Sequence, residues 1–169
     1  MTYRADVLTT PLGPMMALVD DQGALVRLEF VDGQHHPASV HWRGLSYVQD
    51  AAAVRPVAEQ LDAYFAEQLT DFDVPLAPLG NAFLQEAWRH LRRVPYGTTI
   101  SYGELATRLP RPTSARAIGR ANAVNPIAII VPCHRVIGAD GSLTGYAGGI
   151  ERKQALLELE RALPQRSLL

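Results

Sequence analysis

Apolar residues in the first half of the chain follow two different periods. The runs 15–19 and 24–30 are short, strongly apolar and separated by the polar segment 20–23, which ends in glycine. Such an arrangement is typical of a β-hairpin. Over residues 51–68 the apolar positions instead recur every three or four residues, with a proline in the first turns, which predicts an amphipathic helix. The apolar positions of this helix are Val57, Leu61, Tyr64 and Phe65.

A connector with two prolines follows this sheet-plus-helix half. Residues 74–80 read Val-Pro-Leu-Ala-Pro-Leu-Gly, and punctuation of this kind marks a boundary between domains. We therefore predict two domains, 1–79 and 80–169. The first is expected to combine a small sheet with a helix and the second to be mostly helical, which makes the fold class mixed α/β (α+β).

The second half contains the periodic signals of several helices. Asn81 can cap a helix over 82–93. A shorter helix is predicted to begin at Ser101. After a Pro-Arg-Pro break, Thr113 or Ser114 can cap another helix that ends at about Ala123. Two short helices joined by a tight break are typical of a helix-turn-helix unit, although any pair of short packed helices has the same spacing. A final helix is predicted over 150–163.

The helix over 114–123 has an unusual composition for a core helix. Most of its residues are small, and Arg116 and Arg120 lie four residues apart on one face. Small side chains let a helix backbone approach a narrow minor groove closely, whereas long side chains suit the reading of base edges in the major groove. We therefore predict a DNA-binding surface on this helix. Its residues are Ser114, Ala115, Arg116, Ala117, Gly119 and Arg120.

Charge is distributed unevenly between the two predicted domains. Residues 1–79 hold four Lys or Arg and eleven Asp or Glu, a formal charge of −7, whereas residues 80–169 hold twelve and six, a charge of +6. A basic half is typical of a module that binds a polyanion, and the acidic half is expected to be a scaffold. No membrane span or secretion signal is evident, so we expect a cytoplasmic protein.

Cys133 is the only cysteine in the chain and the leading candidate for chemistry. It follows the apolar run 127–131, expected to be a strand, and a proline that must end that strand. His134 and Arg135 come next, and such neighbours favour the nucleophilic thiolate. A lone cysteine is more often a small buried hydrophobe, but this position favours a reactive thiol. A single cysteine also excludes an internal disulfide and a multi-cysteine zinc site, and we expect no metal or cofactor.

The segment 127–138, IAIIVPCHRVIG, resembles the active-site segment of the O6-alkylguanine-DNA alkyltransferases, also called methylated-DNA–protein-cysteine methyltransferases. Further motifs of this family occur in order and at family-like spacing over residues 82–163. They are VPYG at 94–97, SYGELA at 101–106, ARAIG at 115–119, Asn125-Pro126, LTGYAGG at 143–149 and Lys153. The first 80 residues match only loosely. The resemblance implies a ribonuclease H-like domain followed by a winged-helix-like DNA-binding domain.

The same resemblance implies direct-reversal DNA repair. An alkyl group on O6 of guanine, or on O4 of thymine, would pass to Cys133 in one SN2 step, for which a soft thiolate is suited. The product is a stable thioether, so each molecule would act once. The implied partner is double-stranded DNA carrying O6-alkylguanine, bound through the minor groove by a monomer that can bind cooperatively, without a cofactor.

The resemblance also implies how the thiol is activated. His134 would act as a base through a bridging water, and Glu160 would orient His134. The final helix independently supports Glu160, because Lys153, Leu156, Leu157 and Glu160 share one of its faces. A partly buried carboxylate needs a partner. The alternative is a glutamate at the rim of the domain, paired with Lys153 or an arginine.

A pocket for the base is implied around these residues. Tyr102 would donate a proton or hydrogen bond to the leaving guanine, although a core tyrosine would have the same spacing. Tyr146 would form a stacking wall, backbone groups of Cys133, Val136 and Ala147 would read the base edges, and Lys153 belongs to the same binding set. Position 147 is commonly serine in the family, and alanine here removes one hydroxyl contact.

A base stacked inside duplex DNA cannot reach such a pocket and must be extruded, at a cost of about a few kcal/mol. The resemblance implies that Arg116 fills the vacated stack, where the alternative is a simple phosphate contact. Asn125 is expected to act as a hinge, because asparagine tolerates unusual backbone angles. Arg135 is expected to hold nearby backbone carbonyls.

Two other functions fit parts of the sequence. A helix-turn-helix protein that recognises lesions without chemistry would explain the DNA-binding features, but the cysteine counts against it. A cysteine hydrolase built from Cys133, His134 and Glu160 would explain the nucleophile. Thiol hydrolases usually bring the cysteine and histidine from distant segments, and no loop that could stabilise an oxyanion is evident.

Overall fold

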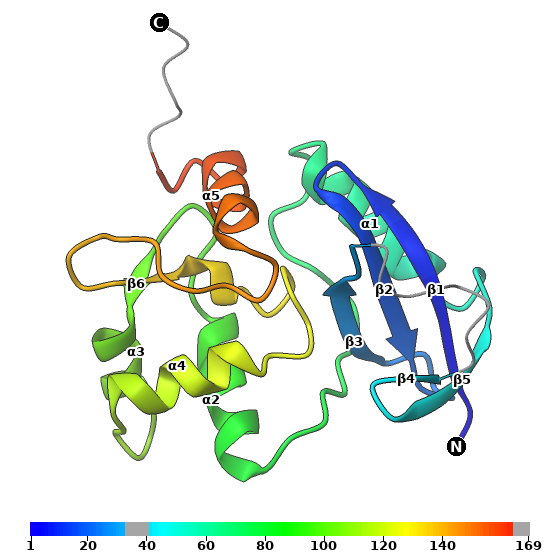
Figure 1. Ribbon diagram of the computed structural model, residues 1–169, viewed down its shortest axis with the longest axis horizontal. Helices are drawn as coiled ribbons and strands as arrows, with labels where there is room; N and C mark the ends of the chain where they lie inside the picture. Colours follow the sequence, from blue (N-terminus) through cyan, green and yellow to red (C-terminus); the bar gives the residue numbers. More distant parts are fainter. Residues whose placement is uncertain (33–40, 164–169) are drawn as a thin grey trace, which may run out of the picture. The chain divides into compact units, whose positions relative to one another are not determined.

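A computed structural model describes residues 1–32 and 41–163 of the chain. It divides the chain into two compact units, Met1–Leu79 and Gly80–Leu169, and Figure 1 shows the elements of each. The division falls at the residues where the proline-punctuated connector places the predicted domain boundary. No helix in the described residues combines the length and the apolar character needed to cross a membrane.

The first unit is built on a five-stranded sheet with the strand order β3-β2-β1-β5-β4. Strands β1 and β2, β2 and β3, and β4 and β5 pair antiparallel, whereas β1 and β5 pair parallel. The predicted hairpin is therefore β2 and β3. The strands are β1 (Tyr3–Thr10), β2 (Gly13–Val19), β3 (Leu25–Phe30), β4 (His41–Trp42) and β5 (Leu45–Gln49).

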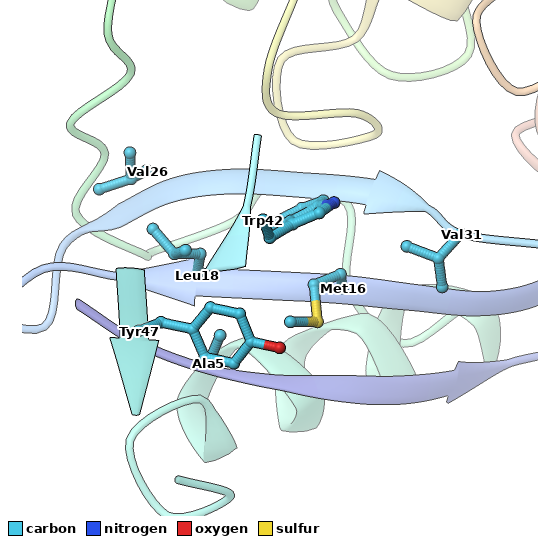
Figure 2. Packing of buried hydrophobic residues seen from close by; sticks show 7 residues of the cluster. All are labelled: Ala5, Met16, Leu18, Val26, Val31, Trp42 and Tyr47. Carbon is cyan, nitrogen blue, oxygen red and sulfur yellow. The ribbon is translucent and has the colours of Figure 1, made fainter. Parts of the chain in front are cut away.

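The inner strand β2 carries apolar side chains on both faces of the sheet. All residues of β2 from Met15 to Val19 are buried, so neither face of this strand meets water. Helix α1 (Arg55–Phe65) contacts β1 and contributes buried Val57, Leu61 and Tyr64 to the packing. Figure 2 shows a further cluster around the strands. It consists of Ala5, Met16, Leu18, Val26, Val31, Trp42 and Tyr47.

The described part of the second unit, residues 80–163, contains four α-helices and one pair of two-residue strands. The helices α2 (Ala82–Arg92), α3 (Tyr102–Arg108) and α4 (Ala115–Ala123) begin directly after Asn81, Ser101 and Ser114. Each of these three residues accepts a hydrogen bond from the backbone N–H three residues later, as the capping pattern predicts. The other elements are α5 (Ile150–Leu159), β6 (Ile100–Ser101) and β7 (Val136–Ile137).

Helices α3 and α4 pack on one another, which fits the predicted helix-turn-helix unit. Leu105 and Ala106 of α3 are buried, as are Ile118 and Ala121 of α4. The backbone of α4 is tied to α2 as well, because Trp88 Nε1 donates to the Ala121 carbonyl over 3.0 Å. Helix α4 is therefore fixed from two sides.

The apolar run 127–131 is not a strand, contrary to the prediction. It folds into a tight turn in which Val131 N donates to the Ile127 carbonyl over 3.2 Å. Asn125 holds both ends of this turn, since its Oδ1 accepts from Ile127 N (3.0 Å) and its Nδ2 donates to the Val131 carbonyl (2.9 Å). Ile129 adopts a φ of 69°, a costly conformation for a β-branched residue. Side-chain bonds of Asn125 thus replace the sheet pairing expected from composition.

Candidate active site

Cys133 begins a short 3₁₀-helix, η1 (Cys133–Arg135), directly after this turn. Its side chain is buried, with 7% of the residue exposed. The thiol nevertheless lines a pocket of about 320 Å³ that opens on the second unit. The other lining residues are Tyr102, Gly119, Asn122, Ala123, Gly145, Tyr146 and Ala147.

The thiol is not activated in the way the sequence predicts. Burial raises the pKa of Cys133, and the Asn125 side chain and the charge of Lys153 offset this only in part. Arg135 and His134 do not stabilise the thiolate here, because their side chains are turned to a carboxylate instead. In the resting protein Cys133 is therefore a protonated thiol at neutral pH, and a base is needed to make it a nucleophile.

Glu160 joins His134 and Arg135 into one buried cluster. Its Oε2 lies 2.8 Å from His134 Nε2 and accepts from Arg135 over 3.1 Å, while its Oε1 accepts from Arg135 Nε over 2.8 Å. Arg135 also donates to the Val94 carbonyl over 2.7 Å. The alternative of a rim glutamate paired with Lys153 is thus wrong. The carbonyl contact of Arg135 follows the prediction, whereas its two-pronged grip on Glu160 was not foreseen.

The charges of this cluster follow from its contacts. Burial by itself would raise the pKa of Glu160, but hydrogen bonds and charge from His134 and Arg135 outweigh it and lower the pKa to about 2. Burial lowers the pKa of His134 despite the opposing effect of Glu160. Glu160 is therefore a carboxylate and His134 is neutral at pH 7.

These protonation states determine the tautomer of His134. An ionised carboxylate can only accept hydrogen bonds, so the hydrogen of the imidazole must be on Nε2, which faces Glu160. The other nitrogen, Nδ1, is buried and has no hydrogen-bond partner among the described residues. Nδ1 consequently carries a lone pair that can accept a proton, on the residue next to Cys133.

Lys153 ties β7 to the loop between β7 and α5. The whole of Lys153 is buried, and its Nζ donates to the carbonyls of Val136 (2.6 Å) and Thr144 (3.2 Å). Thr144 in turn shares a 2.6 Å hydrogen bond with the hydroxyl of Tyr102. Neither Val136 nor Lys153 lines the pocket. Of the five residues predicted to bind the base, these two support its walls, whereas Tyr102, Tyr146 and Ala147 form them.

Helix α4 presents most of the predicted DNA-binding residues to solvent. Ser114, Ala115, Arg116 and Arg120 are exposed and Gly119 is partly buried at the pocket. Ala117 is the exception, because only 7% of it is exposed. The prediction for Ala117 is wrong at the level of its side chain, since its methyl group packs inward where the helix meets the core.

The sequence analysis missed three wall residues, which are Asn122, Ala123 and Gly145. Asn122 and Ala123 lie three and four residues after Gly119, on the same helical face. The assignment of Gly119 to DNA binding could therefore have directed attention to both. Gly145 precedes the predicted wall residue Tyr146. No group of three or more His, Cys, Asp or Glu side chains in residues 1–32 and 41–163 is arranged to hold a metal ion.

Two family models match the chain, and each coincides closely with one of the two units. Residues 3–78 match the ribonuclease-like domain of 6-O-methylguanine DNA methyltransferase, and residues 82–162 match its DNA-binding domain. The predicted fold class is confirmed by these matches and by the structure. We expected only a loose match to the family over the first 80 residues, but a family model covers residues 3–78.

Curated relatives align with the chain over most of the length of both proteins. A methylated-DNA–protein-cysteine methyltransferase of Mycobacterium tuberculosis is 48% identical over 155 residues, which span 92% of this chain and 90% of that protein. One from Methanosarcina acetivorans is 45% identical over 154 residues, spanning 91% of this chain and 96% of that protein.

Solved structures agree with these relatives. The crystal structure of the M. tuberculosis O6-methylguanine methyltransferase superposes with a TM-score of 0.81 at 46% identity, covering 99% of this chain and 96% of that one. The M. tuberculosis OGT in complex with DNA gives a TM-score of 0.82 at 46% identity, covering 96% and 94%. With both units matched and the cysteine set in a walled pocket, the chain belongs to the 6-O-methylguanine DNA methyltransferase family.

Proposed function

We propose that this protein repairs DNA by taking the alkyl group from O6 of guanine, or from O4 of thymine, onto Cys133. A bond forms between Sγ and the alkyl carbon while the bond from that carbon to the base oxygen breaks. The observation that carries the proposal is the thiol of Cys133 in the wall of a pocket, next to the His134–Glu160–Arg135 cluster.

His134 supplies the base that the buried thiol needs. Its Nδ1 can take the thiol proton, directly or through a bridging water, and the imidazolium so formed is stabilised by the Glu160 carboxylate at 2.8 Å. Arg135 acts on Glu160 rather than on the sulfur, because it fixes both carboxylate oxygens in place. The thiolate therefore forms by transfer of its proton to His134 within the site.

The base departs as guanine after gaining a proton. Tyr102 lines the pocket, and its hydroxyl is part of a hydrogen-bonded pair with Thr144. The Tyr102 hydroxyl can donate to a ring nitrogen while it accepts a hydrogen bond from Thr144 Oγ1. The proton that the base gains is balanced by the proton that the Cys133 thiol loses to His134. The thioether left on Cys133 has no leaving group that water could displace, so one molecule removes one alkyl group.

DNA reaches the pocket by way of helix α4. We place this helix in the minor groove, with Arg116 in the gap left by the extruded base and Arg120 and Ser114 at the phosphates. Exposure of these side chains and the charge of +6 over residues 80–169 support this arrangement. Val136 and Lys153 position the loop that carries Tyr146 and Ala147. A reducing cytoplasm would keep the single cysteine free.

The test is the mass of the intact protein after mixing with duplex DNA that carries one O6-methylguanine. We expect a gain of one methyl group per molecule, absent in Cys133→Ser. Unchanged mass with tight binding to the lesion would instead make the protein a recognition module. Methyl released to water would make it a hydrolase.

A further inference from the structure

Unpartnered polar atoms gather around the Cys133 pocket. Within the described residues, buried side-chain nitrogens or oxygens without a hydrogen-bond partner occur on Arg27, Asn122, His134 and Tyr146. Three of these four residues either line the pocket or adjoin Cys133 in sequence. Buried polar groups are nearly always paired, so such a concentration indicates groups whose partner arrives with a ligand. His134 is the base in the proposed reaction and Tyr146 is the expected stacking wall of the pocket, but Asn122 has no role so far.

The position of Asn122 is firmly determined by its neighbours. It follows Ala121, whose carbonyl accepts from Trp88 Nε1, and its own carbonyl accepts from Asn125 N over 3.2 Å. These bonds hold the last turn of α4 next to the turn that leads to Cys133. Asn122 lies in the pocket wall together with Gly119 and Ala123 of the same helix, and Cys133 lines the same pocket.

Asn122 does not stabilise the folded protein in any evident way. Asparagine is a poor helix former compared with alanine or leucine, and it lies within α4 rather than at a cap. Its buried Nδ2 has lost its contact with water without gaining a partner in the described residues, which is unfavourable for folding. An apolar residue of similar size would pack there at lower cost.

We propose that Asn122 reads the extruded base, its Nδ2 donating a hydrogen bond to an acceptor nitrogen of the purine ring. This inference rests on the proposed function. Alkylation of O6 removes the proton from N1, so O6-alkylguanine presents N1, N3 and N7 as acceptors. A donor fixed on α4 complements them, and it adds a second donor to that of Tyr102, from a different wall of the pocket.

The test compares variants and base analogues in one cycle. Asn122→Leu keeps the branched shape of the side chain but removes the donor, and Asn122→Ala removes the donor with a residue that favours helix. Single-turnover transfer rates are measured with duplexes carrying O6-methylguanine or its 1-deaza, 3-deaza or 7-deaza analogue. With the parent base we expect both variants to be slower by about 3- to 10-fold, the range for one neutral hydrogen bond.

The analogues identify the bonded atom. One of them should slow the wild type by about the same factor and should not slow either variant further, because the bond is already lost. Val124→Ala, at an exposed site two residues along, is the matched control and should retain the wild-type rate. Wild-type rates in both Asn122 variants would overturn the proposal. Every analogue costing the variants as much as the wild type would also overturn it.

Failure of the proposed function is distinguishable from failure of this inference. If the wild type gains no methyl mass from the parent duplex, the repair proposal itself is wrong. If the wild type is methylated and the variants are slowed without the analogue effect, Asn122 contributes only packing. Near-UV circular dichroism of both variants checks that the fold is retained. Where one variant is unstable, the other carries the comparison with the analogues.

Discussion

Glu160 is the residue on which the electrostatics of the site depend. It is almost fully buried and accepts hydrogen bonds from two side chains, of which Arg135 carries a permanent charge. Removing one partner of a buried ion pair leaves the other charge uncompensated, which costs much more than the pair contributes when intact. Changes at Glu160 should therefore affect stability and chemistry together.

We predict that Glu160→Gln lowers the free energy of unfolding by about 3–5 kcal/mol, because Arg135 loses its carboxylate. It should also slow methyl transfer by roughly 10²-fold, since the imidazolium of His134 is no longer stabilised. Urea unfolding and quenched single-turnover assays measure the two effects. Glu151→Gln, at an exposed position in the first turn of α5, is the control and should change neither quantity.

Stability should decrease in acid because of the same residue. The pKa of Glu160 is about 2 in the folded protein against an ordinary value of 4.5, so its contribution is present above pH 4.5 and is lost as the pH falls toward 2. The shift corresponds to about 3 kcal/mol. His134 acts in the same direction, since its lowered pKa means that protonation favours unfolding. Urea unfolding at pH 7 and pH 3.5 measures the loss, which should be smaller in Glu160→Gln.

The raised pKa of Cys133 predicts slow reaction with simple electrophiles. The rate of carboxamidomethylation by iodoacetamide should be low at pH 7 and should rise as the pH increases above the pKa of a free thiol, because only the thiolate attacks. Mass spectrometry of the intact protein gives the rate. A fast reaction that is independent of pH between 6 and 9 would mean that the thiol is already ionised.

The turn between α4 and η1 connects Cys133 to the helix that we propose to bind DNA. Its shape depends on Asn125, whose amide bonds to both ends of the turn. Ile129 keeps an unfavourable backbone angle only because these bonds and the burial of its side chain hold it. The turn is thus a place where a small change moves the thiol.

We predict that Asn125→Ala destabilises the protein by about 1–3 kcal/mol, the cost of leaving buried backbone groups unpaired. Methyl transfer should slow by more than this loss of stability explains at temperatures where the variant is folded. Asn81→Ala is the matched control, because it removes the cap of α2 at a cost of about 1 kcal/mol and Asn81 does not line the pocket. Equal transfer rates in the two variants would contradict a special role for Asn125.

The sequence predicted elements best where local signals determine them. The caps at Asn81 and Ser114, the start of a helix at Ser101 and the β2–β3 hairpin were predicted correctly, because turn and cap chemistry is local. Strand β1 was missed because Arg4 and Asp6 interrupt its apolar pattern, and only pairing with β2 and β5 makes it a strand. The run 127–131 failed for the opposite reason, since its strand-like composition is overridden by the Asn125 side chain. The pocket walls contributed by α4 depend on tertiary packing, which no local signal encodes.

At the scale of the whole molecule, the uneven charge determines how it meets DNA. Binding of a cationic surface to DNA releases counterions, so the affinity decreases with salt in proportion to the number of phosphates neutralised. Residues 80–169 carry the positive charge and residues 1–79 the negative charge. The salt dependence should therefore arise from the second unit.

We predict that the logarithm of the DNA-binding constant decreases linearly with the logarithm of salt concentration. Arg120→Ala should reduce the slope by about one, the effect of one lost phosphate contact. Arg27→Ala, in the first unit, should leave the slope unchanged. Fluorescence anisotropy with undamaged duplex between 50 and 200 mM salt provides the measurement. A similar change of slope in both variants would show that contacts with DNA are not confined to the second unit.

Helix α4 bears arginines on its exposed side and contributes Gly119, Asn122 and Ala123 to the wall of the pocket. In the proposed complex, one rigid helix therefore both contacts DNA and forms part of the wall that limits the size of the cavity. A substitution that tilts α4 to suit a different groove would also widen or narrow the space for the alkyl group. Substrate range can be tuned without changing α4 at Gly145, Tyr146 and Ala147, which line the pocket from the loop before α5. Variation among relatives in tolerance for bulky lesions should accordingly concentrate in that loop rather than in the helix.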